Sequence, residues 1–174
     1  MRNFLSHIIY IATLASVILC QGCESVDDNR IPNMPVNISL ADAGMWNTYG
    51  VAGFGMSRNF ILSQRIPTNF PFSSKTYTGF GGVLLIEGLD PFSGNSSLPL
   101  AYDLACPVER KAETRVSINP DTYMAECHEC GSSYDVTMQR GAPIAGPAAS
   151  GKFKYALKSY NCLPTGQGGY IITN

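Results

Sequence analysis

The sequence is poor in charge and in histidine, and both shortages narrow the range of functions. Charged residues make up 14 % of the 174 residues, and the formal net charge is −1. A chain of this kind has neither a basic nor a strongly acidic face, so we expect no nucleic-acid partner. The 2 histidines, His7 and His128, leave few imidazole groups for a metal site.

Catalytic motifs and long internal apolar runs are also missing. No serine lies in a nucleophile-elbow pattern, and no glycine-rich phosphate loop opens a predicted helix. We therefore identify no catalytic residues. The sequence favours a protein that is not an enzyme; if it is redox-active, we expect an electron carrier rather than a complete oxidoreductase. After residue 20, no apolar stretch approaches the length of a membrane-spanning helix.

The N-terminus has the pattern of a secretory signal peptide. An apolar run from Phe4 to Cys20 follows a short positive start and is short for a spanning helix. It ends in Gly22-Cys23, which resembles the lipobox of bacterial lipoproteins. The resemblance implies a signal peptide at 1–22 and lipidation of Cys23. Cys20 is a poorer candidate because the preceding leucine is too large for the usual cleavage pocket, and an uncleaved anchor is the alternative.

Residues 23–33 are predicted to be an acidic tether. Glu24 to Asn29 resembles the export signal that follows the lipid cysteine in lipoproteins of the Bacteroidetes, and a solvated linker is the other interpretation. We expect a lipid-anchored protein of the cell envelope, on the periplasmic or surface face of the outer membrane. Its partners would be the membrane, through the N-terminal lipid, and an unknown envelope protein.

Residues 34–174 have the size and composition of one all-β domain. The chain contains 17 glycines and 11 prolines, a content typical of short strands joined by turns. Ala41 to Trp46 is predicted as one helical turn or an irregular bend. Alternating or continuous apolar patterns predict strands at 34–40, 59–64, 81–88, 98–105, 114–118, 123–126, 133–136, 153–160 and 169–173.

Two cysteine loops stand out in the second half of the chain. The first reads Cys106-Pro-Val-Glu, and the second reads Cys127-His-Glu-Cys-Gly-Ser-Ser-Tyr-Asp. They resemble the cluster-binding loops of Rieske iron–sulfur proteins, with Cys106 and Cys127 at the two cysteine positions. Val108 and Cys130 stand at the two histidine positions. The resemblance, from about Gly81 to the C-terminus, implies antiparallel sheets in a partial barrel with a small two-loop, cluster-binding-like subdomain at about 104–148.

The ligand set departs from the Rieske pattern. Without residues 1–22, His128 is the one histidine left, so the usual 2Fe–2S centre with two imidazole ligands is excluded. Zinc could bind Cys106, Cys127 and Cys130, with His128, Glu109 or water as the fourth ligand. A disulfide could join two of the three cysteines instead.

An iron–sulfur cluster with other ligands is the third alternative. It needs a fourth donor, and Cys162 is expected on a strand too far from the loops. The cofactor is thus zinc, a 2Fe–2S cluster or none. The resemblance implies a degenerate Rieske-like domain that serves as a non-catalytic binding or accessory module. The alternative function is electron transfer, through an iron–sulfur cluster or through the dithiol of Cys127 and Cys130.

Overall fold

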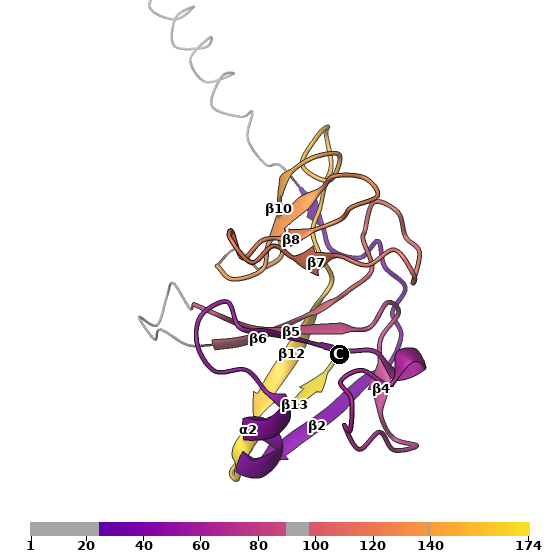
Figure 1. Cartoon of the computed structure of the whole chain (residues 1–174). Helices are drawn as coiled ribbons and strands as arrows, with labels where there is room; N and C mark the ends of the chain where they lie inside the picture. The colour runs from indigo at the N-terminus through magenta and orange to yellow at the C-terminus, as the bar shows by residue number, and fades with distance from the viewer. Residues whose placement is uncertain (1–24, 90–97, 139) are drawn as a thin grey trace, which may run out of the picture.

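The computed structural model describes residues 25–89, 98–138 and 140–174. Figure 1 shows a larger β body with a smaller subdomain above it that carries β7, β8 and β10. The predicted all-β class, a partial barrel with a small loop subdomain, is confirmed. The predicted signal peptide and Cys23 lie outside the described residues. Within the described ranges, no helix is long and apolar enough to cross a membrane.

The larger sheet of the described chain has seven antiparallel strands and is nearly closed. In spatial order the strands are β3 (Ser57–Phe60), β5 (Val83–Gly88), β6 (Leu98–Asp103), β12 (Ser159–Pro164), β13 (Gly168–Thr173), β2 (Val36–Asp42) and β4 (Tyr77–Thr78). The two edge strands are therefore β3 and β4. Antiparallel hairpins join β5 to β6 and β12 to β13, and the second uses Asn161–Pro164 rather than the predicted strand at 153–160.

Strand β5 lies between two hydrophobic cores. Its apolar run is buried on both faces, as the unbroken sequence of branched residues predicts. Val83 and Leu85 pack into the core of the larger sheet. Leu84 and Ile86 point the other way, into a core shared with the loop subdomain. Because neighbouring residues of a strand face opposite sides, one strand joins both halves of the domain.

The smaller sheet supports the two cysteine loops. Among the described residues it has four strands, in the order β10 (Ala142–Ala145), β9 (Ser133–Asp135), β8 (Ala125–Glu126) and β7 (Ser117–Ile118). A short hairpin, β7–β8, precedes the second loop, and β9 leaves it. The buried side chains of Val116, Ala125 and Tyr134 attach this sheet to the core under β5.

The helix and the segment before the domain add two features. Helix α2 (Ala43–Tyr49) lies where a turn or bend was predicted, and Asp42 caps it by accepting a hydrogen bond from the Met45 N–H. Part of the predicted tether is packed on the domain. Strand β1 (Val26–Asp27) pairs with β11 (Lys154–Tyr155), and Ile31 is 2 % exposed. An apolar isoleucine within the acidic segment explains this attachment.

Two predicted strands are interrupted in the structure, and two others, at 114–118 and 123–126, are shortened to β7 and β8. The segment 59–64 is strand only to Phe60 and continues as a 3-10 helix, Leu62–Gln64, that ends at Arg65 in the left-handed conformation. The segment 153–160 is interrupted between β11 and β12. Ala156 and Leu157 are both buried, and their N–H groups bond to Asp27 and Gly141 respectively. Two different acceptors for neighbouring residues break the ladder that the alternating pattern predicts.

Candidate metal centre

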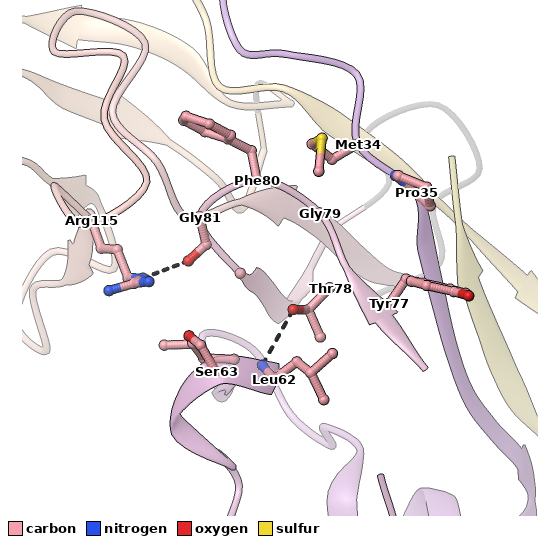
Figure 2. A pocket seen from close by; sticks show the side chains of 12 residues that line it. Met34, Pro35, Leu62, Ser63, Tyr77, Thr78, Gly79, Phe80, Gly81 and Arg115 are labelled. Atoms are coloured by element: carbon pink, nitrogen blue, oxygen red, sulfur yellow. Dashed lines mark hydrogen bonds between the residues drawn. The ribbon is translucent and has the colours of Figure 1, made fainter. Parts of the chain in front are cut away.

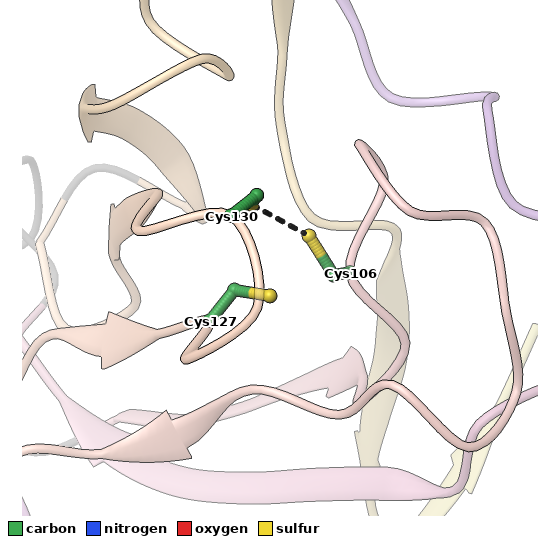
Figure 3. A group of neighbouring side chains, drawn as sticks. All are labelled: Cys106, Cys127 and Cys130. Atoms are coloured by element: carbon green, nitrogen blue, oxygen red, sulfur yellow. Dashed lines mark hydrogen bonds between the residues drawn. The ribbon is translucent and has the colours of Figure 1, made fainter.

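Three of the predicted site residues meet in the loop subdomain. The Sγ atoms of Cys106, Cys127 and Cys130 all lie within 4.8 Å of one another. Cys106 comes three residues after β6, and Cys127 comes directly after β8. Figure 3 shows Cys106 reaching the second loop from the opposite side. Cys106 and Cys127 are buried, and Cys130 is half-buried.

Backbone hydrogen bonds hold both loops in shape. In the first loop, the Cys106 N–H donates to the Thr114 carbonyl, and the Cys106 carbonyl accepts from the Arg110 N–H at 2.8 Å. In the second loop, the Cys127 carbonyl accepts from the Gly131 N–H at 2.9 Å. Gly131 has a φ of +71°, a left-handed conformation that glycine adopts without a steric penalty. These bonds fix the backbone positions from which the cysteine side chains project.

A third segment lies behind the second loop. At Gly146 a Cβ atom would lie 2.6 Å from the Gly131 carbonyl oxygen, so only glycine allows this approach. Two residues later, the Ala148 N–H donates to Ser132 Oγ at 3.0 Å. The segment Gly146-Pro147-Ala148 thus contacts the second cysteine loop from behind.

Two hydroxyl groups contact the sulfurs. Tyr134 Oη lies 3.5 Å from Cys106 Sγ, and Cys130 Sγ donates to Ser132 Oγ at 3.2 Å. Tyr134 is fully buried, and burial raises its pKa above the ordinary value, with the neighbouring Cys106 acting in the same direction. Tyr134 therefore stays protonated and can donate to a thiolate at Cys106.

The environments of two of the thiols differ. Burial raises the pKa of Cys127 to about 12 despite nearby backbone N–H groups. At Cys130, burial also raises the pKa, but hydrogen bonds with Ser132 and with the other two cysteines outweigh it and lower the pKa overall. Cys130 is thus the more readily deprotonated of this pair. A metal that binds at Cys127 would displace its proton.

The sulfur spacing fits one tetrahedral metal ion. Cys106 Sγ and Cys130 Sγ are 3.6 Å apart. Two thiolates on the same zinc lie about 3.8 Å apart, because each Zn–S bond is about 2.3 Å long and the geometry is tetrahedral. A disulfide needs about 2.05 Å between its sulfurs. Soft thiolate ligands favour zinc or iron over harder cations.

His128 does not join the three cysteines. Its side chain is exposed, and its Nε2 atom lies 2.9 Å from Ser117 Oγ. Glu109 is half-buried and is likewise not part of the group. Val108 stands, like Cys130, at a position that carries histidine in the Rieske pattern. Its side chain packs against the hydrophobic core. The described protein thus supplies three sulfur ligands, and a fourth would come from solvent or from another molecule.

Cys162 belongs to a different part of the molecule. It lies on β12 and packs against the core of the larger sheet, away from the three-cysteine group. Burial raises its pKa to about 12, and the nearby Glu87 acts in the same direction. The prediction that Cys162 lies too far away to be the fourth ligand agrees with this placement.

Sequence reasoning identified the three cysteines that meet here, but it assigned no role to Ser132 or Tyr134. Both belong to the Gly-Ser-Ser-Tyr stretch that carried the family resemblance, so a signal was present. No family model, curated protein or solved structure matches this chain. The functional inference therefore depends on the geometry of the cysteine loops and of the residues around them.

Proposed function

We propose that this chain is a lipid-anchored protein of the cell envelope whose loop subdomain binds one zinc ion through Cys106, Cys127 and Cys130. The ion would join the loop before β7 to the loop after β8, and the two loops leave the same end of that antiparallel hairpin. In this role the domain is a non-catalytic binding or accessory module with a degenerate Rieske-like fold. The observation that carries the proposal is the convergence of three sulfurs within 4.8 Å.

The arrangement favours a single ion over a two-iron cluster. A 2Fe–2S centre spreads its protein ligands over two irons that are separated by bridging sulfides. Here one loop supplies two sulfurs and the other supplies one, and all three are mutually close. Cys106 and Cys127 are 0 % and 1 % exposed, as expected for a structural site. An ion held by these three sulfurs would stabilise the loops, and its fourth position would be open to solvent or to another molecule.

A dithiol is the second candidate, and one distance favours it. Cys106 Sγ and Cys130 Sγ lie 3.6 Å apart on opposite loops, so a small rotation of the side chains would allow a bond. Oxidation would convert the two thiols to a disulfide and release two electrons and two protons to an external dithiol–disulfide carrier. Metal analysis of the purified protein separates this dithiol from the proposed zinc site.

Metal analysis of the full chain, purified without oxygen in lipid nanodiscs, tests the proposal. We expect about one zinc per chain, lost on Cys106→Ser, Cys127→Ser or Cys130→Ser. Cys162→Ser is the matched control and should keep the zinc. Iron with acid-labile sulfide would contradict the zinc proposal, and a metal-free disulfide would support the dithiol.

The proposed anchor has its own test. Mass spectrometry of the mature N-terminus should find acyl chains on Cys23, and Cys23→Ser should release the protein from the membrane fraction. Cys20→Ser is the control, because that residue would be removed with the signal peptide. Membrane attachment that survives Cys23→Ser would contradict the lipid anchor and support an uncleaved N-terminal segment.

A further inference from the structure

A pocket separate from the cysteines lies where the larger sheet fails to close. It has a volume of about 350 Å³ and lies between the residues that follow edge strand β3 and those of edge strand β4. At this seam the Leu62 N–H donates to Thr78 Oγ1 at 3.3 Å. Figure 2 shows this bond and the residues around the pocket. The volume lies within the range of small-molecule sites, about 300 to 1,000 Å³.

The walls of the pocket are mainly apolar. Met34, Leu62 and Phe80 line it, and Met34 is 45 % exposed. Exposed apolar side chains around a hollow can bury the apolar body of a ligand. Transfer of such a body out of water is favourable in proportion to the area covered.

One cationic group, Arg115, lines this mainly apolar pocket (Figure 2). Its Nε atom donates to the Gly81 carbonyl, which fixes the plane of the guanidinium group. No acidic side chain lines the pocket in the described part of the chain. The two terminal nitrogens therefore meet no carboxylate from the pocket wall. A fixed guanidinium with terminal donors to spare is suited to a carboxylate.

The turn that positions Arg115 is itself rigid. The buried Asp103 carboxylate accepts from the N–H groups of Phe80 and Gly81, each at 2.9 Å. Its Oδ2 atom also accepts from Tyr160 Oη at 2.7 Å. Gly81 is packed so closely that an added Cβ would lie 2.5 Å from the Ala105 nitrogen. The carbonyl that holds Arg115 is thus fixed before any ligand arrives.

We propose that this pocket binds a small molecule with one carboxylate and an apolar or aromatic body. A single guanidinium balances a single negative charge, which favours a carboxylate over a phosphate dianion. The apolar walls would cover the rest of the ligand. This site is distinct from the proposed zinc site and would give the module a ligand of its own.

Calorimetry on the full chain in lipid nanodiscs tests the pocket, with empty nanodiscs as the blank. The probe is 3-phenylpropionate, and its neutral match is 3-phenylpropanamide. We expect the acid to bind at least about tenfold more tightly than the amide, because only the acid pairs with the guanidinium. Equal affinities, or no binding of the acid, would overturn the proposal.

Two variants and one control locate the binding. Arg115→Met should weaken binding of the acid by about tenfold or more and leave the weak binding of the amide unchanged. Arg58→Met is the matched control for Arg115→Met. Arg58 Nε also donates to a glycine carbonyl, but Arg58 lies outside the pocket lining. It should bind both probes like the original protein. Unchanged acid binding by a folded Arg115→Met protein would refute the assignment.

A second variant covers the case in which Arg115→Met does not fold. Ser63 is exposed and lines the pocket, so Ser63→Trp fills the space and keeps Arg115. We expect this variant to lose binding of both probes. Acid binding retained by Ser63→Trp would place the ligand elsewhere and overturn the proposal.

Discussion

At the scale of single residues, two buried tyrosines differ in whether the hydroxyl group has a hydrogen-bond partner. Tyr134 Oη contacts Cys106 Sγ, whereas Tyr102 Oη has no hydrogen-bond partner among the described residues. Burial raises the pKa of both hydroxyls, so both remain protonated. One hydroxyl therefore supports the cysteine site, and the other carries the cost of losing water without gaining a bond.

These tyrosines form a matched pair of substitutions. Tyr134→Phe should lower zinc affinity by about tenfold, because it removes an outer-shell donor to a ligand sulfur. Tyr102→Phe should leave zinc affinity unchanged and leave stability the same or slightly higher. Competition with a chromophoric chelator measures the affinities. Equal affinity in the two variants would remove Tyr134 from the site.

Spacing was enough to predict that Cys127 and Cys130 lie together, and the family resemblance implied that Cys106 joins them, but neither predicted the placement of His128. Cys127 and Cys130 are three residues apart in one tight loop, so their proximity follows from local geometry. The histidine between them turns outward to Ser117, which belongs to the neighbouring strand. That contact depends on the register of β7 with β8, which local sequence does not specify.

At the scale of elements, the segment that links Cys106 to Arg115 connects the two proposed sites. Cys106 N–H bonds to the Thr114 carbonyl, and Arg115 forms a β-bridge with Ala105. Both ends of this segment are thus fixed next to β6. Zinc at Cys106 would hold one end, and the Gly81 carbonyl holds the other through the guanidinium.

Removal of zinc should loosen this segment selectively. We expect the amides of Cys106 and Gly131 to exchange with deuterium faster after treatment with a chelator, because zinc would hold their loops together. Amides of β13 in the larger sheet serve as the control and should keep their rates. Binding of 3-phenylpropionate should weaken in the same sample. Loop exchange that is indifferent to the chelator would show that zinc does not stabilise the loops.

The elements were predicted well where a strand is buried or ends in a tight turn. The run at β5 and its hairpin with β6 follow from continuous apolar residues. The 3-10 helix at Leu62–Gln64 was missed because the continuous apolar residues Phe60 to Leu62 favour a strand. Its position is set by pairing of Ile61 with Ile66 across the turn, a contact that appears only in the folded chain.

At the scale of the whole molecule, two hydrophobic cores share one strand and leave one sheet seam open. The class of the fold followed from its glycine and proline content and from its apolar patterns. The pocket at the seam was not predicted, because it depends on which strands become edges. Strand order is a long-range property that a single sequence reveals poorly.

Several neutral groups buried in these cores predict how stability depends on pH. Burial raises the pKa of Cys162 to about 12 and raises that of Tyr160 above its ordinary value, where the Asp103 carboxylate acts in the same direction. In the unfolded chain these groups ionise near pH 8.5 and 10, respectively. The unfolded state therefore loses protons first as pH rises. Their contribution to stability is complete below about pH 8.5 and is lost toward pH 12 and above.

We therefore expect the midpoint of urea unfolding to be constant from pH 7 to about 8.5 and to fall steadily above that range. In Cys162→Ala the fall above pH 8.5 should be shallower, because this variant lacks one of the two thiols whose pKa is raised by burial to about 12, and Cys127 keeps the other. The original protein and Cys162→Ala both retain the proposed zinc site. Any effect of that site on the urea midpoint therefore cancels when the two proteins are compared. A flat profile up to pH 12, or an equally steep fall in both proteins, would show that Cys162 does not contribute a thiol with a raised pKa. Fluorescence-monitored urea titrations at half-unit pH steps are sufficient to distinguish these outcomes.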